Sequence, residues 1–158
     1  MPMPAVMEAD TGLRRIVDLL GGPAVFDRPF ATPMDAHATI LRGFPNQSLW
    51  TFIDYVPRLA QGDALDKVMG MSLRTLQRRK KEGAHERLSR EQSGRLYKAA
   101  EIVAKAIDIF GSTAAAEDFL EKPAMALDGE RPIELLATPA GAELVERHLA
   151  QLDLGVYV

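Results

Sequence analysis

Apolar side chains recur at helical spacing over most of the chain, and no segment alternates as a β-strand would, with the last few residues left open. Residues 10–20 place four apolar side chains on one helical face before Gly21-Gly22-Pro23 ends that helix. Residues 90–110 carry the longest apolar stripe, and Ile102 and Ile109 widen it, so we expect this helix to be central and mostly buried. The pattern predicts an all-α fold.

Polar cap residues and prolines predict where the other helices begin. The proline-rich segment 22–46 is predicted to connect helices and to hold one short helix near 34–42. The predicted caps are Asn46 for a helix over 47–58, Asp63 for 64–69, Ser72 for 72–81, Ser89 with Gln92 for 90–110, Ser112 or Thr113 for a helix to about 121, and Thr138-Pro139 for 139–152. One or two helical turns are expected at 132–136.

Two short helices joined through Gly70-Met71-Ser72 form the strongest local signal, which is typical of a helix-turn-helix. The side chains expected to pack inward are Leu65, Val68 and Met69 from the first helix, and Leu73 and Leu76 from the second. The second helix would enter the major groove of DNA. A solvated basic helix with no DNA partner remains the alternative interpretation.

Each polar residue of the second helix has a predicted role toward DNA. Arg74, Gln77 and Arg78 are the candidate readers of bases, because Arg suits guanine and Gln suits adenine. Thr75 lies on the same outward face. The candidates for phosphate contact are Arg79, Lys80, Lys81 and the helix N-terminus at Ser72. Asp66 and Arg79 depart from the small and apolar residues that are usual at these two positions.

The charge distribution supports a local anion-binding surface. The chain of 158 residues has a net charge of −3, yet residues 74–87 hold six Lys/Arg and two Glu. Residues 113–158 hold nine Asp/Glu and three Lys/Arg. A basic block within an acidic protein therefore predicts one face for an anion and another surface for a different partner.

The C-terminus is unusually apolar, since the chain finishes Asp153-Leu154-Gly155-Val156-Tyr157-Val158. Terminal residues are normally polar and frayed. Two interpretations stay open from the residues alone: the tail folds back on its own core, or it inserts into a cleft of a partner protein.

Candidate catalytic groups are few. There is no cysteine, which excludes a disulfide scaffold, a thiolate metal site and a cysteine nucleophile. The three histidines, His37, His85 and His148, show no metal-ligand spacing, and no glycine-rich phosphate loop is present. We therefore expect neither an enzyme nor a cofactor or metal. The chain lacks a long apolar run and a secretory signal, so a cytoplasmic protein with no membrane partner is expected.

An ordered set of motifs resembles the Xre/MbcA/ParS antitoxins of type II toxin–antitoxin modules, specifically the Xre antitoxins paired with RES-domain toxins. The resemblance covers roughly residues 40–158. The motifs are I-L-R-G-F-P at 40–45, M-S-L-R-T-L-Q-R-R-K at 71–80, L-S-R-E-Q-S-G-R-L at 88–96, A-I-D-I-F-G at 106–111, A-E-D-F-L at 116–120, L-D-G-E-R-P-I-E-L-L-A-T-P-A-G at 127–141 and V-E-R-H-L-A-Q-L-D-L-G-V at 145–156.

The resemblance implies a Cro-like helix-turn-helix domain followed by a small helical toxin-binding domain. The implied divisions are an N-terminal helix and proline-rich segment (1–45) with a dimerisation role, a DNA-binding domain (46–98) and a toxin-binding domain (99–158). It further implies a homodimer that represses its own operon and binds a RES toxin, an enzyme that degrades NAD⁺. The C-terminus would block the toxin's active-site cleft.

The toxin-binding residues expected on this basis are Arg131, Leu152, Leu154, Gly155, Val156, Tyr157 and Val158, although Arg131 could instead brace a loop between helices. Two other function classes remain: a DNA-binding regulator without a toxin partner, and a structural adaptor that assembles through helix 90–110.

Overall fold

The structure is a computed structural model that describes residues 4–155, and within that range it holds helices and no β-strand. The helices are α1 Pro4–Leu19, α2 Pro33–Arg42, α3 Asn46–Tyr55, α4 Ala64–Met69, α5 Leu73–Glu82, α6 Arg90–Phe110, α7 Thr113–Glu121, α8 Pro132–Leu135 and α9 Pro139–Asp153. Short 3₁₀ turns lie at Gly22–Ala24, Pro57–Ala60 and Met125–Leu127. The all-α prediction is confirmed. None of these helices has the length and apolar character needed to cross a bilayer.

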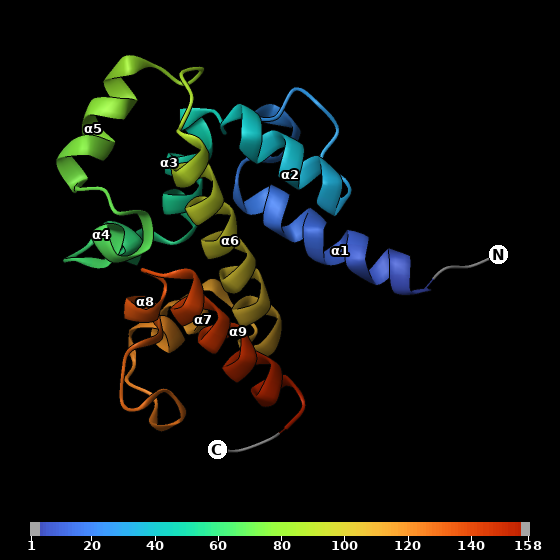
Figure 1. The fold of residues 1–158 in the computed structure, drawn as a ribbon, viewed down its shortest axis with the longest axis vertical. Helices are drawn as coiled ribbons and strands as arrows, with labels where there is room; N and C mark the ends of the chain where they lie inside the picture. The colour runs from blue at the N-terminus through green and yellow to red at the C-terminus, as the bar shows by residue number, and fades with distance from the viewer. Residues whose placement is uncertain (1–3, 156–158) are drawn as a thin grey trace.

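The helix α6 runs through the middle of the molecule, as its wide apolar stripe predicts (Figure 1). It packs against α1 and α2 on one side, and against α4, α7 and α9 on the other. Leu96, Ala100 and Val103 are fully buried on it, whereas Phe110 in its last turn is 37% exposed. The C-terminal end of α6 therefore lies nearer the surface than its periodicity suggests.

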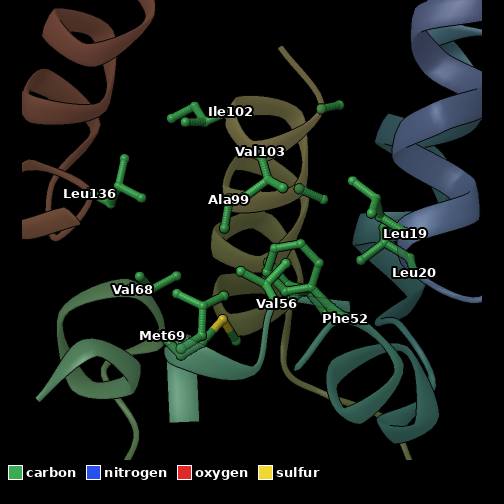
Figure 2. Close-up of a cluster of buried hydrophobic side chains, with 14 of the residues drawn as sticks. Leu19, Leu20, Phe52, Val56, Val68, Met69, Ala99, Ile102, Val103 and Leu136 are labelled. Carbon is green, nitrogen blue, oxygen red and sulfur yellow. The ribbon is translucent and has the colours of Figure 1, made fainter. Parts of the chain in front are cut away.

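A single hydrophobic core joins the N-terminal, middle and C-terminal parts of the chain. Figure 2 shows α6 between Leu19 of α1 on one side and Leu136, just after α8, on the other, with Phe52 of α3 and Val68 of α4 beside it. The boundary expected between residues 98 and 99 falls inside α6. The two regions that the resemblance separates therefore share one central helix.

Most of the predicted helix caps are present in the structure. Ser89 and Gln92 form a complete capping box, and Thr138 and Ser112 accept hydrogen bonds from backbone N–H groups of α9 and α7. Two predicted caps are wrong: Asp63 makes no capping hydrogen bond, and Asn46 is the first residue of α3 rather than its cap. Asn46 is fully buried and donates from Nδ2 to Arg79 O (3.4 Å) and Gly83 O (3.3 Å) instead.

The inward faces of the helices differ from prediction at a few positions. Leu73, expected to pack inward, is 46% exposed, because the first turn of α5 projects from the core. In the last helix Val145 is buried, whereas the neighbouring Leu144 is exposed. Phe52, which the pattern did not single out, is among the largest fully buried side chains.

Candidate DNA-binding and toxin-binding sites

The tight turn between α4 and α5 is held in place by α6. Gly70 has φ = 64°, in the left-handed region that favours glycine, and its N–H donates to Asp66 O (2.8 Å). Arg95 of α6 donates from Nε to Val68 O (2.9 Å) and from Nη2 to Lys67 O (3.0 Å). These bonds satisfy carbonyl groups in the last turn of α4 that have no partner within that helix. The arrangement fixes α4 on α6 and sets where α5 begins.

The helix α5 presents a basic face to solvent, as predicted. Ser72 caps it by accepting a hydrogen bond from Thr75 N–H (3.1 Å). Thr75 is half-buried, and its Oγ1 lies 3.1 Å from Ser72 Oγ. The exposed polar side chains of the helix are Arg74, Gln77, Arg78, Lys80, Lys81 and Glu82. Arg78 also lies 3.6 Å from Glu82, one helical turn further on. The surface therefore offers cations and an amide on one short helix.

Arg79 does not belong to this solvent-facing set. Its Nη1 donates to Arg87 O (3.3 Å) and to Asn46 Oδ1 (3.5 Å), and its Nη2 donates to Gln92 Oε1 (3.2 Å). The side chain is partly buried and ties α5 to α3 and α6. The phosphate contact of Arg79 stays a prediction, and in this structure its guanidinium donates to three groups of the chain itself. Arg79 occupies a position where an apolar residue is usual. Oxygen atoms of neighbouring elements accept hydrogen bonds from its guanidinium group.

The motif at 40–45 serves to fasten the loop that follows α5. Leu88 N–H donates to Phe44 O (2.8 Å), Asn46 N–H donates to Glu86 O (2.6 Å), and Phe44 N–H donates to Ser93 Oγ (2.8 Å). Gly43 has φ = 86°, and a β-carbon there would overlap the carbonyl oxygen of Leu88. This part of the family pattern therefore fixes the segment after α5 against the α2–α3 connection.

Arg131 braces the loop before α8, which was one of its two expected roles. Its Nη2 lies 2.8 Å from Glu134 Oε1 and 3.6 Å from Asp63 Oδ1, at the start of α4. The hydrogen bond from Arg131 lowers the pKa of the Glu134 carboxyl group. Because both acidic partners belong to this chain, the guanidinium is already engaged within the molecule.

A second connection between the two halves of the molecule escaped prediction. Glu117 of α7 is buried, and its carboxylate accepts from Arg58 N–H (2.8 Å). The Arg58 side chain also lies 2.6 Å from Asp118 and 3.3 Å from Glu121. Arg58 and Glu117 are 59 residues apart, so no local pattern in the sequence indicates this pairing.

The end of α9 exposes apolar surface. Leu152 is partly buried, Leu154 is 80% exposed, and Gly155 has φ = 76°. The other expected tail residues, Val156, Tyr157 and Val158, lie outside the described residues. Two further exposed apolar side chains occur in this part of the chain: Met125 at 88% and Leu144 at 45%. Sequence periodicity did not predict these two as surface residues.

His148 lies in the core of the C-terminal region, as its position on the inner face of the last helix predicts. It is 9% exposed, and its ring stacks on Phe119 with a centroid separation of 5.9 Å. Among the described side chains of residues 12–155, no group of three or more His, Asp or Glu has the arrangement of a metal site.

Comparison with known proteins identifies the class of the C-terminal region. Residues 105–155 match the family model described as "Antitoxin Xre/MbcA/ParS C-terminal toxin-binding domain". The matched segment begins in α6 and includes α7, α8 and α9. The chain therefore carries the toxin-binding domain of the Xre/MbcA/ParS antitoxins, and the resemblance seen in the sequence is confirmed.

Two relatives named as antitoxins agree with this assignment. A "Prs ADP-ribosylating antitoxin" of Sphingobium sp. (strain YBL2) is 29% identical over 162 aligned residues, which cover 95% of this chain and 98% of the relative. An "Antitoxin Xre" of Pseudomonas putida strain KT2440 is 35% identical over 68 residues, which cover 43% of each chain. Both relatives carry the name antitoxin, in agreement with the toxin-binding domain that residues 105–155 match.

Proposed function

We propose that the protein neutralises a RES-domain toxin, an NAD⁺-degrading enzyme, by direct binding through its C-terminal region, with the C-terminus blocking the toxin's active-site cleft. The observation that carries this proposal is the toxin-binding domain over residues 105–155, together with the exposed apolar end of α9. The protein acts by binding and not by catalysis, and it works in the cytoplasm beside its toxin.

Exposed apolar side chains within residues 105–155 support a protein partner. Leu154, Met125 and Leu144 leave large parts of their surface in water. Covering such surface contributes about 25 cal/mol per Å². The apolar end of α9 supports insertion of the C-terminus into the toxin's cleft, because Leu154 is largely exposed and does not pack against the rest of this molecule.

Co-expression tests this function directly. The product of the adjacent gene is expressed with and without this chain, and cellular NAD⁺ is measured. We expect NAD⁺ to collapse only when the chain is absent. A variant lacking residues 154–158 should fail to protect, whereas Met34→Ser, which alters an equally exposed apolar residue on α2, should protect fully. Full protection by the truncated chain would contradict the blocking mechanism.

The name of the near full-length relative favours a second candidate for the toxin's chemistry, namely ADP-ribosylation. Transfer of ADP-ribose to a protein also consumes NAD⁺ and releases nicotinamide, so loss of NAD⁺ alone does not separate the two reactions. Detection of ADP-ribose on cellular proteins separates them. Modified protein indicates a transferase toxin, and free ADP-ribose without modified protein indicates an NAD⁺-degrading toxin.

We also propose that α4 and α5 bind the operator of the protein's own operon as a homodimer. The exposed Arg74, Gln77 and Arg78 on a capped helix support base contacts, and Lys80 and Lys81 support phosphate contacts. One short helix gives modest affinity, so two copies on a palindromic site are expected. The alternatives are a regulator with no toxin partner and an adaptor that binds no DNA.

A DNA mobility-shift assay distinguishes these possibilities. The probe is the duplex immediately upstream of the gene, and an unrelated duplex of equal length serves as the control. Preferential binding that weakens as salt rises supports operator recognition. Absence of binding would favour the adaptor, and binding without any effect on a toxin would favour the stand-alone regulator.

A further inference from the structure

Four arginines outside α5 gather near its C-terminal end. We propose that they form a second phosphate-binding surface, which extends DNA contact beyond the helix-turn-helix; this rests on the proposed operator binding. The residues, called here the arginine patch, are Arg28, Arg42, Arg87 and Arg90. They come from the loop before α2, the end of α2, and the segment where α6 begins.

The fold brings these side chains together from distant parts of the sequence. Arg28, Arg42 and Arg87 line one surface hollow of about 10 Å³, a space about the size of one water molecule. Arg90 joins them because its Nε donates to Leu41 O (3.1 Å), next to Arg42. Three segments that are far apart in the chain therefore direct cations to one place.

The arginines of the patch form no close ion pair within the molecule. Among the described side chains of residues 12–155, no carboxylate lies within 4.0 Å of any of its four guanidinium groups. Asp27 lines the same hollow, Asp35 interacts electrostatically with Arg42, and Glu86 and Glu91 are neighbours in sequence, so four acids lie near the four cations without forming a close ion pair with them. Arginines elsewhere, such as Arg15 and Arg147, do have a carboxylate partner. Converging like charges are unfavourable unless an anion compensates them.

Hydrogen bonds to nearby residues of the chain orient part of the patch for an anion. Arg87 donates from Nη1 to Gly43 O (2.7 Å), and Arg42 donates from Nη2 to Thr39 Oγ1 (3.3 Å). A guanidinium group has five N–H donors in a planar fork, so each of these arginines keeps donors for phosphate oxygens. Side chains that are already oriented lose less conformational entropy on binding.

The position of the patch favours DNA as the source of the phosphate. Arg79 of α5 donates to Arg87 O, and Asn46 donates to Gly83 O, so the last turn of α5 is tied to the segment that carries Arg87. Figure 1 shows the loop after α5 returning to α6 beside the α2–α3 connection. A duplex lying on α5 would therefore pass its sugar-phosphate backbone over the patch.

The test measures how DNA affinity depends on salt. Arg28→Ala/Arg42→Ala removes two patch charges without touching the backbone anchors of Arg87 and Arg90. The control, Arg15→Ala/Arg147→Ala, removes two exposed arginines elsewhere and leaves the same net charge. The probes are the upstream duplex and an unrelated duplex of equal length, and the thermal midpoint of each variant checks its folding.

We expect the plot of log affinity against log salt to become shallower by about 2 for the patch variant and to stay unchanged for the control. At about 0.1 M salt each lost phosphate contact lowers affinity about eightfold. Both duplexes should be weakened equally, because phosphates carry no sequence information. An unchanged slope in the patch variant would overturn the inference while operator binding stands. Failure of the unaltered protein to bind either duplex would overturn the proposed operator function, and the inference with it.

Discussion

Gly70 and Arg95 meet where the turn between α4 and α5 contacts the central helix α6, and this contact sets a strict requirement at one residue. The conformation of Gly70 is left-handed, and a β-carbon there would lie 2.7 Å from Arg95 Nη1. The same guanidinium holds the last carbonyls of α4. A side chain at this position would therefore disturb both the turn and its anchor.

Gly70→Ala is expected to lower the free energy of unfolding by more than the roughly 1–2 kcal/mol that a left-handed non-glycine residue costs. Gly62→Ala is the matched control, because Gly62 has φ = 57° but open space where its β-carbon would lie. Urea denaturation of both variants isolates the contribution of Arg95. Equal losses of unfolding free energy in the two variants would show that the contact with Arg95 adds nothing to the cost of Gly70→Ala.

Arg78 and Arg79 are neighbours in sequence with opposite environments, and their substitution should separate stability from DNA binding. Arg79→Ala removes the donor to Asn46 Oδ1 and to Arg87 O, and one of the two donors to Gln92 Oε1, so we expect a loss of about 1 kcal/mol in unfolding free energy. Arg79→Met, of similar length, should retain most of the stability. Arg78→Ala should leave stability unchanged and weaken operator binding. The opposite pattern would return Arg79 to the DNA-binding set.

Helices were predictable where their signals are local, and interactions between helices were not. The caps at Ser72, Ser89 and Thr138 satisfy N–H groups three residues away, so a short window of sequence contains the whole interaction. The predicted cap at Asn46 is wrong because its amide donates to carbonyl groups more than 30 residues away, which no short window of sequence contains. The anchor of Arg95 on α4 is likewise invisible in a local pattern.

The capping box of α2 gives a prediction about pH. Asp35 accepts hydrogen bonds from Ala31 N–H (2.8 Å) and Thr32 N–H (3.1 Å), and the bond from Ala31 is the main cause that lowers the pKa of Asp35. Its stabilising effect is therefore present above the unfolded pKa of about 3.9 and is lost as pH falls through the lower folded value. Thermal midpoints of the native chain and Asp35→Ala should differ at neutral pH and converge in acid. A difference in thermal midpoint that stays the same at every pH would exclude a stabilising role for the ionised Asp35 carboxylate.

The whole molecule has one core, and this limits which substitutions can separate its proposed activities. The fully buried Ile102 of α6 lies in the same hydrophobic cluster as Phe52 of α3 and Leu149 of α9. Truncation of Ile102 to alanine should cost about 2–5 kcal/mol. DNA binding and toxin neutralisation should then fail together, which makes this variant uninformative about either site.

Surface changes at opposite ends of the molecule should separate the two activities. Arg74→Ala/Arg78→Ala removes exposed cations from α5, and we expect it to abolish operator binding while neutralisation persists. Deletion of 154–158 should do the reverse, because α9 ends in exposed apolar surface far from α5 (Figure 1). Mobility shifts and cellular NAD⁺ measured on both variants test this. Rising salt should weaken the DNA complex steeply and the toxin complex little, since only the first depends on counterion release. Loss of both activities in either variant, with the thermal midpoint unchanged, would mean that the toxin and DNA surfaces overlap.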